Sequence, residues 1–217
     1  MHDKIRDMKS LNPVIGCSIG CPYCYAKRIN ERFSHTPDFT KPQFFPERLE
    51  KLYRKKPTMW FLTSMSDISE WDPFWIKTVL SVIKKNPQHQ YMFLTKRPNK
   101  LDMDLRGLNV WPGVTVTCKS DLHRIAELQQ HVKSDRYTVT FEPLFEDLGQ
   151  IDLRGIGWVV IGTETGNRKG KVTAKKEWIM NITEQAEELH IPIMMKAVLE
   201  PIVGSDAFIQ TSINEII

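Results

Sequence analysis

Gly16-Cys17-Ser18-Ile19-Gly20-Cys21-Pro22-Tyr23-Cys24-Tyr25-Ala26 contains three of the four cysteines of this 217-residue chain, in the spacing Cys-x3-Cys-x2-Cys. Thiolates this close together can bind a single metal centre. A structural zinc site normally has four protein ligands, whereas an iron–sulfur cluster with only three cysteines keeps one iron available for a substrate or cofactor. The spacing therefore predicts a metal centre with an open coordination position.

The composition is that of an ordinary soluble globular protein, with 41% hydrophobic and 26% charged residues. No apolar run approaches the roughly 18–20 residues that cross a bilayer, and the first residues lack the apolar core of a signal peptide. We therefore expect a cytoplasmic protein with no membrane partner. The net charge of +4 does not by itself indicate nucleic-acid binding. Four cysteines make no disulfide framework, and a tight cluster in a reducing compartment indicates metal binding.

Short apolar segments alternate with helical patterns along the chain, which predicts a parallel sheet with helical crossovers. A complete eight-stranded barrel takes about 250 residues, so we predict an α/β fold: a partial (β/α) barrel of six to seven parallel strands, open on one side. No Gly-x-Gly-x-x-Gly follows the first strand, so the dinucleotide fingerprint is absent. The expected strands are 12–16, 59–63, 91–95, 110–117, 137–141, 158–161 and 191–195.

No linker divides the sequence, so we expect one domain over residues 1–217, with 1–11 and 199–217 as terminal extensions and residues 1–12 loosely held. A helix is expected to leave the cysteine loop over 23–33, and another to start at Pro46. Further helices are expected after three capping residues, which are Asp72, Ser120 and Thr173.

The cysteine motif also carries a family resemblance. Cys-x3-Cys-x-aromatic-Cys at the end of a first barrel strand resembles the signature of the radical S-adenosylmethionine (SAM) superfamily, and Cys17, Cys21, Tyr23 and Cys24 match it position by position. Residues 12 to about 198 resemble a phage-associated group within that superfamily, the phage Gp37/Gp68-like proteins, a domain of unknown function. The chain departs from that group in the gap between its first two cysteines, which is often longer there. The other stretches that carry the resemblance are 12–13, 63–67, 94–98, 142–144 and 162–166.

The resemblance implies a [4Fe–4S] cluster on Cys17, Cys21 and Cys24, with SAM bound at the fourth iron. It implies that one-electron reduction, by an external reductant such as flavodoxin or ferredoxin, cleaves SAM to methionine and a 5′-deoxyadenosyl radical that abstracts hydrogen from a substrate. The protein then supplies binding, orientation and exclusion of water, while the cofactor supplies the radical chemistry. Tyr23, beside the third cysteine, joins the expected cofactor-binding residues.

Polar residues follow the expected strands, at the barrel end where such sites lie. Superfamily members often place Gly-Gly-Glu after the second strand to hold the amino group of SAM. Here the matching residues are Ser64, Ser66 and Asp67, although Asp67 is equally suited to cap a helix. Lys96 or Arg97 is expected to pair with the methionine carboxylate of SAM, and Arg97 is also a candidate substrate contact.

The later strand ends supply further candidates. Thr115 and Thr117 share a strand face by period two, so both can contact a ribose. Glu142 follows an apolar strand and needs a partner, for which a ribose hydroxyl is suitable. Glu164 lies in a glycine-flanked segment that resembles a cofactor or substrate loop, although such sequences also form plain turns. Lys196 ends the last strand and faces either the site, as a substrate contact, or solvent.

Cys118 lies just past the fourth expected strand. It can donate a hydrogen atom to a substrate radical, as a rim cysteine does in spore photoproduct lyases. A lone cysteine is more often a small buried hydrophobe.

Two functions of different classes remain open. The first is a radical SAM enzyme acting on an unknown substrate, for which a nucleic acid or nucleotide is one candidate class. The alternative is a zinc-stabilised nucleic-acid-binding module without catalysis, its zinc held by the three cysteines and completed by a remote histidine or by Cys118. Zinc sites more usually combine two Cys-x2-Cys halves, and the sequence contains one such half.

Overall fold

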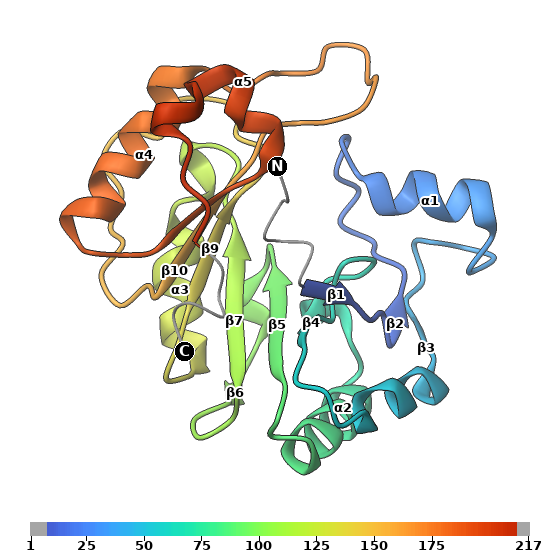
Figure 1. Ribbon diagram of the computed structural model, residues 1–217. Helices are drawn as coiled ribbons and strands as arrows, with labels where there is room; N and C mark the ends of the chain where they lie inside the picture. Colours follow the sequence, from blue (N-terminus) through green and yellow to red (C-terminus); the bar gives the residue numbers. More distant parts are fainter. Residues whose placement is uncertain (1–7, 212–217) are drawn as a thin grey trace.

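The computed structural model describes residues 8–211, and its main feature is one seven-stranded sheet (Figure 1). Every pair of neighbouring strands in it is parallel. The partial barrel expected from the βα alternation is thereby confirmed. In sheet order the strands are β1 (Met8–Ser10), β4 (Met59–Phe61), β5 (Gln90–Thr95), β7 (Val110–Thr115), β9 (Thr138–Phe141), β10 (Trp158–Ile161) and β11 (Ile193–Met195).

The first strand of the sheet differs from the expectation. The stretch 12–16 was expected to be that strand, but its strand β2 (Val14–Ile15) pairs antiparallel with β3 (Gln43–Phe44) outside the main sheet. The edge position is taken by β1, which pairs in parallel with β4. The expectation that residues 1–12 are loosely held is thus wrong for 8–10. A three-residue edge strand is held mainly by backbone hydrogen bonds, so its side chains carry no hydrophobic pattern.

The outer face of the sheet packs against helices. Alternate residues of the six strands from β4 to β11 in this sheet, such as Tyr91, Phe93 and Val159, belong to the main hydrophobic core together with side chains from three helices. These helices are α2 (Pro73–Lys85), α3 (His123–His131) and α4 (Lys176–Glu188). Helices on the outer face are the arrangement that parallel βα units produce.

The inner face of the sheet has two halves. Near the amino ends of the strands, a second apolar cluster of Met59, Met92, Trp111, Trp158, Val160 and Met194 fills the barrel. Toward the carboxyl ends, the inward residues Phe61, Leu94, Thr115 and Thr140 line a cavity instead. In β4, β5 and β7 the residue that lines the cavity and the residue that belongs to the apolar cluster point to the same face of the sheet, because side chains alternate along a strand. The inner face of the sheet therefore forms the floor of the cavity.

The helix starts were predicted unevenly. Asp72 caps α2 as expected, and its side chain accepts a hydrogen bond from the backbone N–H of Phe74. Ser120 does not cap a helix, because the chain first makes a 3₁₀ turn and α3 begins after Leu122. Thr173 does not cap one either, because α4 starts at Lys176 without a side-chain cap.

The remaining elements are short. The segment from Pro46 is a 3₁₀ helix, η2 (Pro46–Tyr53), and the helix after the cysteine loop is α1 (Tyr25–Phe33). A further two-stranded sheet pairs β6 (Met103–Asp104) with β8 (Val132–Lys133). Between residues 8 and 211, no helix has both the length and the apolar character to cross a membrane. The other helical turns are η3 (Ile68–Glu70), η4 (Pro98–Lys100), η5 (Lys119–Asp121), η6 (Ala197–Leu199), α5 (Glu200–Val203) and η7 (Ser205–Ala207).

Candidate functional site

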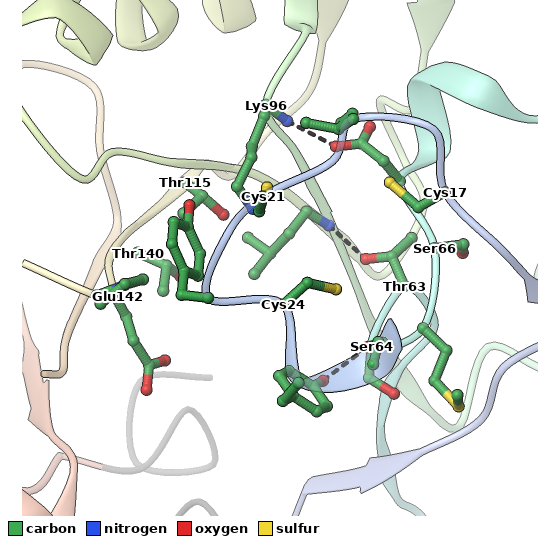
Figure 2. Close-up of a pocket in the computed structure, with 18 of the residues that line it drawn as sticks. Cys17, Cys21, Cys24, Thr63, Ser64, Ser66, Lys96, Thr115, Thr140 and Glu142 are labelled. Carbon is green, nitrogen blue, oxygen red and sulfur yellow. Dashed lines mark hydrogen bonds between the residues drawn. The ribbon is translucent and has the colours of Figure 1, made fainter. Parts of the chain in front are cut away.

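The cavity at the carboxyl ends of the strands has a volume of about 280 Å³. Most of its lining comes from the cysteine loop, from the first turn of α1 and from the carboxyl ends of six strands, or the residues just after them, namely β4, β5, β7, β9, β10 and β11. Cys17, Cys21 and Cys24 all line it, and Figure 2 shows their side chains around one part of it, with Thr115 and Glu142 on the far side. The structure thus brings the three cysteines and most of the predicted strand-end residues to one place.

Backbone contacts fix the start of the cysteine loop. The Gly16 N–H donates to the carbonyl of Met65 at 3.0 Å, and the Cys17 N–H donates to the carbonyl of Phe39 at 2.7 Å. Gly16 has a φ of +116°, and a Cβ there would lie 2.8 Å from the Cα of Pro42. Only glycine tolerates both the left-handed backbone and this close approach.

Glu70, which sequence reasoning missed, holds the middle of the loop. Its carboxylate accepts a hydrogen bond from the Ser18 N–H at 2.7 Å and a second one from the Ser18 hydroxyl. The same carboxylate pairs with Arg97 at 3.3 Å. Arg97, predicted as a carboxylate or substrate contact, is therefore engaged with Glu70 and does not line the cavity. A lone glutamate in a 3₁₀ turn gives no sequence signal for this role.

The three thiols fit a metal centre through their chemistry. All are free, and Cys24 also serves as the N-cap of α1, where its sulfur accepts the Lys27 N–H at 3.3 Å. Burial raises the pKa of the Cys17 thiol to about 12, and the nearby carboxylates of Glu70 and Asp67 add to this rise. A bound metal deprotonates a coordinating thiol, so the positive charge of a metal centre would offset these effects.

The fourth cysteine lies apart from the other three. The sulfur of Cys118 lies 3.1 Å from the hydroxyl of Ser120, and Cys118 does not belong to the cavity lining. Cys118 therefore does not supply the fourth ligand that a structural zinc site on the cysteine loop needs. Within residues 8–211, no three or more histidine, cysteine, aspartate or glutamate side chains, the loop cysteines included, are grouped so as to hold a single metal ion. The cysteines of an iron–sulfur cluster instead bind different irons of one cluster.

The segment after β4 reaches the cavity with its polar groups already engaged. The Ser64 hydroxyl donates to the side-chain oxygen of Asn12 at 2.9 Å, and the Met65 N–H donates to the same atom at 3.0 Å. The Ser66 hydroxyl accepts the indole N–H of Trp71 at 3.0 Å. Asn12 thus sets the turn that carries the two predicted serines.

Asp67 lines the cavity and also serves as a helix cap. Its carboxylate caps η3 through the Ser69 N–H at 3.0 Å, and it accepts the Thr95 hydroxyl at 2.6 Å and the Lys96 N–H at 2.8 Å. Of the two readings of Asp67, the capping one is present in the structure. These bonds join the segment after β4 to the end of β5.

Lys96 and Tyr23 lie together at the cavity. The Lys96 ammonium is 5.9 Å from the centre of the Tyr23 ring, within the range of a cation–π contact. Tyr23 also meets Phe145 edge-on at 5.2 Å. Burial raises the pKa of the Tyr23 hydroxyl, and the nearby Cys21 adds to the rise. Lys96 makes no ion pair with any residue between 8 and 211 and is available to an anionic ligand.

The two predicted threonines of β7 do not share a role. Thr115 lines the cavity, whereas the Thr117 hydroxyl donates to Asp121 at 2.8 Å and lies outside the lining. The strand ends at Thr115, so the period-two rule no longer applies at Thr117. The neighbour of Thr115 across the sheet is Thr140 on β9, which also lines the cavity and which sequence reasoning missed.

The last predicted residues are arranged in pairs. The Glu142 carboxylate forms an ion pair with the Lys196 ammonium, and both line the cavity, so Lys196 faces the site. The buried Glu164 forms two hydrogen bonds with the Arg168 guanidinium, at 2.5 and 2.7 Å. These bonds hold the pKa of the Glu164 carboxyl below its usual value. Glu164 therefore stabilises the loop that contains Arg168, and it also lines the cavity.

The chain matches a known protein family over most of its length. A family model described as "Protein of unknown function (DUF5131)" matches residues 5–201. The chain belongs to this DUF5131 family. No curated protein matches the sequence.

Solved structures similar to this DUF5131 protein share its fold. One is a variant of spore photoproduct lyase with bound AdoMet and a dinucleoside spore photoproduct, at a TM-score of 0.56 and 11% identity over 86% of this chain and 75% of that chain. Another is spore photoproduct lyase complexed with dinucleoside spore photoproduct, at a TM-score of 0.52 and 12% identity over the same shares. At this level of identity the likeness concerns the fold.

Proposed function

We propose that this DUF5131 protein is a radical SAM enzyme that holds a [4Fe–4S] cluster on Cys17, Cys21 and Cys24. The observation that carries the proposal is the placement of three free thiols, with no fourth cysteine among them, at a cavity floored by the inner face of a half-barrel. Three thiolates leave one iron for a ligand. When bound and reduced by an external donor such as flavodoxin or ferredoxin, the cluster would cleave SAM to methionine and a 5′-deoxyadenosyl radical that abstracts hydrogen from the substrate.

The chain's own residues bind and orient SAM in this proposal. Lys96, a cation without an ion-pair partner in the described chain, binds the methionine carboxylate. Ser64, Ser66 and Asp67 lie on the turn beside the cysteine loop, where the amino group is expected. Both serine oxygens keep a lone pair that can accept an amino N–H, because Ser64 Oγ donates to Asn12 and Ser66 Oγ accepts one bond, from the Trp71 indole.

The other end of SAM meets the hydroxyls of the sheet. Thr115 and Thr140 stand side by side in the register of β7 and β9 and face the cavity. A ribose or an adenine edge is the part of SAM with matching donors and acceptors. Glu142 and Lys196 lie on the same rim and are left for the substrate, as is the loop of Glu164.

The substrate class we propose is a nucleic acid or nucleotide. Its support is the shared fold with a lyase that is described with a bound dinucleoside, together with a net charge of +4. The group assignment as phage Gp37/Gp68-like, the hydrogen-donor role of Cys118 and a cytoplasmic location stay predictions from the sequence.

Anaerobic reconstitution tests the proposal. We expect about four irons and four sulfides per chain, and release of 5′-deoxyadenosine when dithionite and SAM are added. Cys21→Ser should lose both, while Cys118→Ser, a matched change outside the cavity, should keep the cluster. One tightly held zinc per chain with no cleavage of SAM would contradict the proposal and favour the zinc-stabilised nucleic-acid-binding module.

A further inference from the structure

Some of the charged side chains that line the cavity form ion pairs within residues 8–211, and others do not. Its charged lining residues are Arg28, Asp67, Lys96, Glu142, Glu164 and Lys196. Glu142 pairs with Lys196, Glu164 pairs with Arg168, and Asp67 accepts three hydrogen bonds. Two cations are left, Lys96 at the Tyr23 ring and Arg28. Arg28 makes no hydrogen bond or ion pair with any other residue of the range 8–211.

Arg28 is a solvent-exposed residue near the amino end of α1, and it lines the cavity. It lies one helical turn after Cys24, the N-cap of α1, and the first turn of that helix has no acidic residue. The amino end of a helix carries a partial positive charge. The guanidinium of Arg28 adds a full positive charge at the cavity itself, so this end of the cavity attracts anions.

The guanidinium also rests against the loop that follows β10. A Cβ at Gly166 would lie 3.2 Å from Nη1 and 3.3 Å from Nη2 of Arg28. Gly166 has a φ of +84°, so both the backbone and the packing favour glycine. The hydroxyl of the exposed Thr165 lines the cavity next to it. Helix α1 and this loop therefore bring a guanidinium and a free hydroxyl to one edge of the cavity.

We propose that Arg28 and Thr165 form the binding site for a phosphate group of the substrate, an inference that rests on the nucleotide-type substrate proposed above. The planar guanidinium matches two phosphate oxygens at once, and the hydroxyl donates a third hydrogen bond. The neighbouring Glu142 does not repel the phosphate, because Lys196 neutralises it. The phosphate belongs either to a phosphodiester of a strand or to a nucleoside monophosphate.

Calorimetric titration of the reconstituted full chain tests this site. Three probes are used: the dinucleotide TpT, thymidine 5′-monophosphate, and a TpT analogue with an uncharged methylphosphonate linkage. We expect at least one charged probe to bind about tenfold or more tightly than the uncharged analogue, because hydrogen bonds to charged groups contribute that much. A preference for TpT identifies a strand as the source, and a preference for the monophosphate identifies a mononucleotide.

Arg28→Gln should reduce this preference to about twofold or less. Arg28→Lys should keep part of it, because lysine retains the positive charge but lacks the planar guanidinium that binds two phosphate oxygens at once. Lys27→Gln is the matched control: it removes one positive charge from the same helical turn, at an exposed residue outside the cavity. The proposed phosphate site would be contradicted if Arg28→Gln and Lys27→Gln reduced the preference for the charged probes equally, or if the unmodified chain showed no such preference. Circular dichroism of each variant checks the fold.

The same titration on protein without a cluster separates this inference from the proposed function. Phosphate binding that depends on Arg28, in a chain that fails to take up iron, would contradict the proposed function alone. A chain that assembles the cluster and cleaves SAM, but binds all three probes equally, would contradict the phosphate site alone.

Discussion

Thr140 places a buried hydroxyl at the cavity. Its side chain is 5% exposed and lines the cavity, yet its Oγ1 atom has no hydrogen-bond partner in the described structure. Buried hydroxyls are normally paired, and leaving one unpaired costs about 1–3 kcal/mol. A ligand in the cavity would supply the partner, and the neighbouring Thr115 would share it.

Replacing this hydroxyl should therefore separate binding from stability. In Thr140→Val a methyl group takes the place of an unpaired hydroxyl, so we expect an unchanged or higher free energy of unfolding in urea. The affinity for SAM, measured by equilibrium dialysis, should fall about threefold to tenfold, the value of one hydrogen bond. Thr138→Val is not a suitable control, because the Thr138 hydroxyl is bonded to the carbonyl of Trp158. Unchanged affinity in Thr140→Val would show that this hydroxyl does not contact SAM.

At the scale of elements, the cysteine loop depends on the 3₁₀ turn that follows β4. Glu70 ends that turn, and its carboxylate is bonded to Ser18 of the loop and to Arg97 after β5. The Glu70 side chain is only 11% exposed, so these bonds are partly shielded from water. The positions of η3 and of the strand end of β5 thereby set the position of the loop.

Glu70→Gln tests this dependence. The amide keeps the shape but removes the charge, so two charge-assisted hydrogen bonds from Ser18 and one ion pair weaken, and we expect a loss of about 1–2 kcal/mol in the free energy of unfolding. The Ser18 amide should exchange its hydrogen faster, and a reconstituted cluster should lose iron faster. Glu50→Gln, an exposed glutamate on η2, is the control and should change none of these. Normal exchange at Ser18 in Glu70→Gln would show that the loop is held by its other contacts.

At the scale of the whole molecule, the cavity joins parts that are far apart in the sequence. The cysteine loop and α1 lie near the edge of the sheet formed by β1 and β4. Helices α4 and α5 and the strands β9 and β10 lie toward the opposite edge (Figure 1). A ligand that contacts the loop, Lys96 and the threonines would connect these parts. It would bind the folded chain alone and so stabilise it.

We therefore expect SAM to raise the melting temperature of the protein. At a concentration 100-fold above its dissociation constant, the gain is about 2.7 kcal/mol, or about 5–10 °C for a chain of this size. Hydrogen exchange should slow in the cysteine loop and at the ends of β7 and β9. It should stay unchanged around Met59, Trp111 and Trp158, which fill the opposite half of the barrel. Slowing at that apolar cluster instead would place the ligand elsewhere.

The sequence by itself determined the strands of the half-barrel and the three thiols. Buried strands such as β5 and β10 are continuous apolar runs, because a parallel sheet is covered on both faces. The cysteines are equally visible, because their spacing is local. Edge strand β1 and the starts of α3 and α4 were not visible, because they depend on pairing and on loop length.

Only the tertiary structure decided which polar residues meet. It placed Thr140 beside Thr115, paired Lys196 with Glu142 and Arg97 with Glu70, and left the side chains of Arg28 and Lys96 at the cavity without an ion pair among residues 8–211. It also placed Cys118 outside the lining. Each of these outcomes depends on the register and curvature of the sheet, which arise from contacts between residues distant in sequence. The motif is thus the basis of the metal chemistry that we propose, and the folding of the sheet around it decided which side chains line the cavity there.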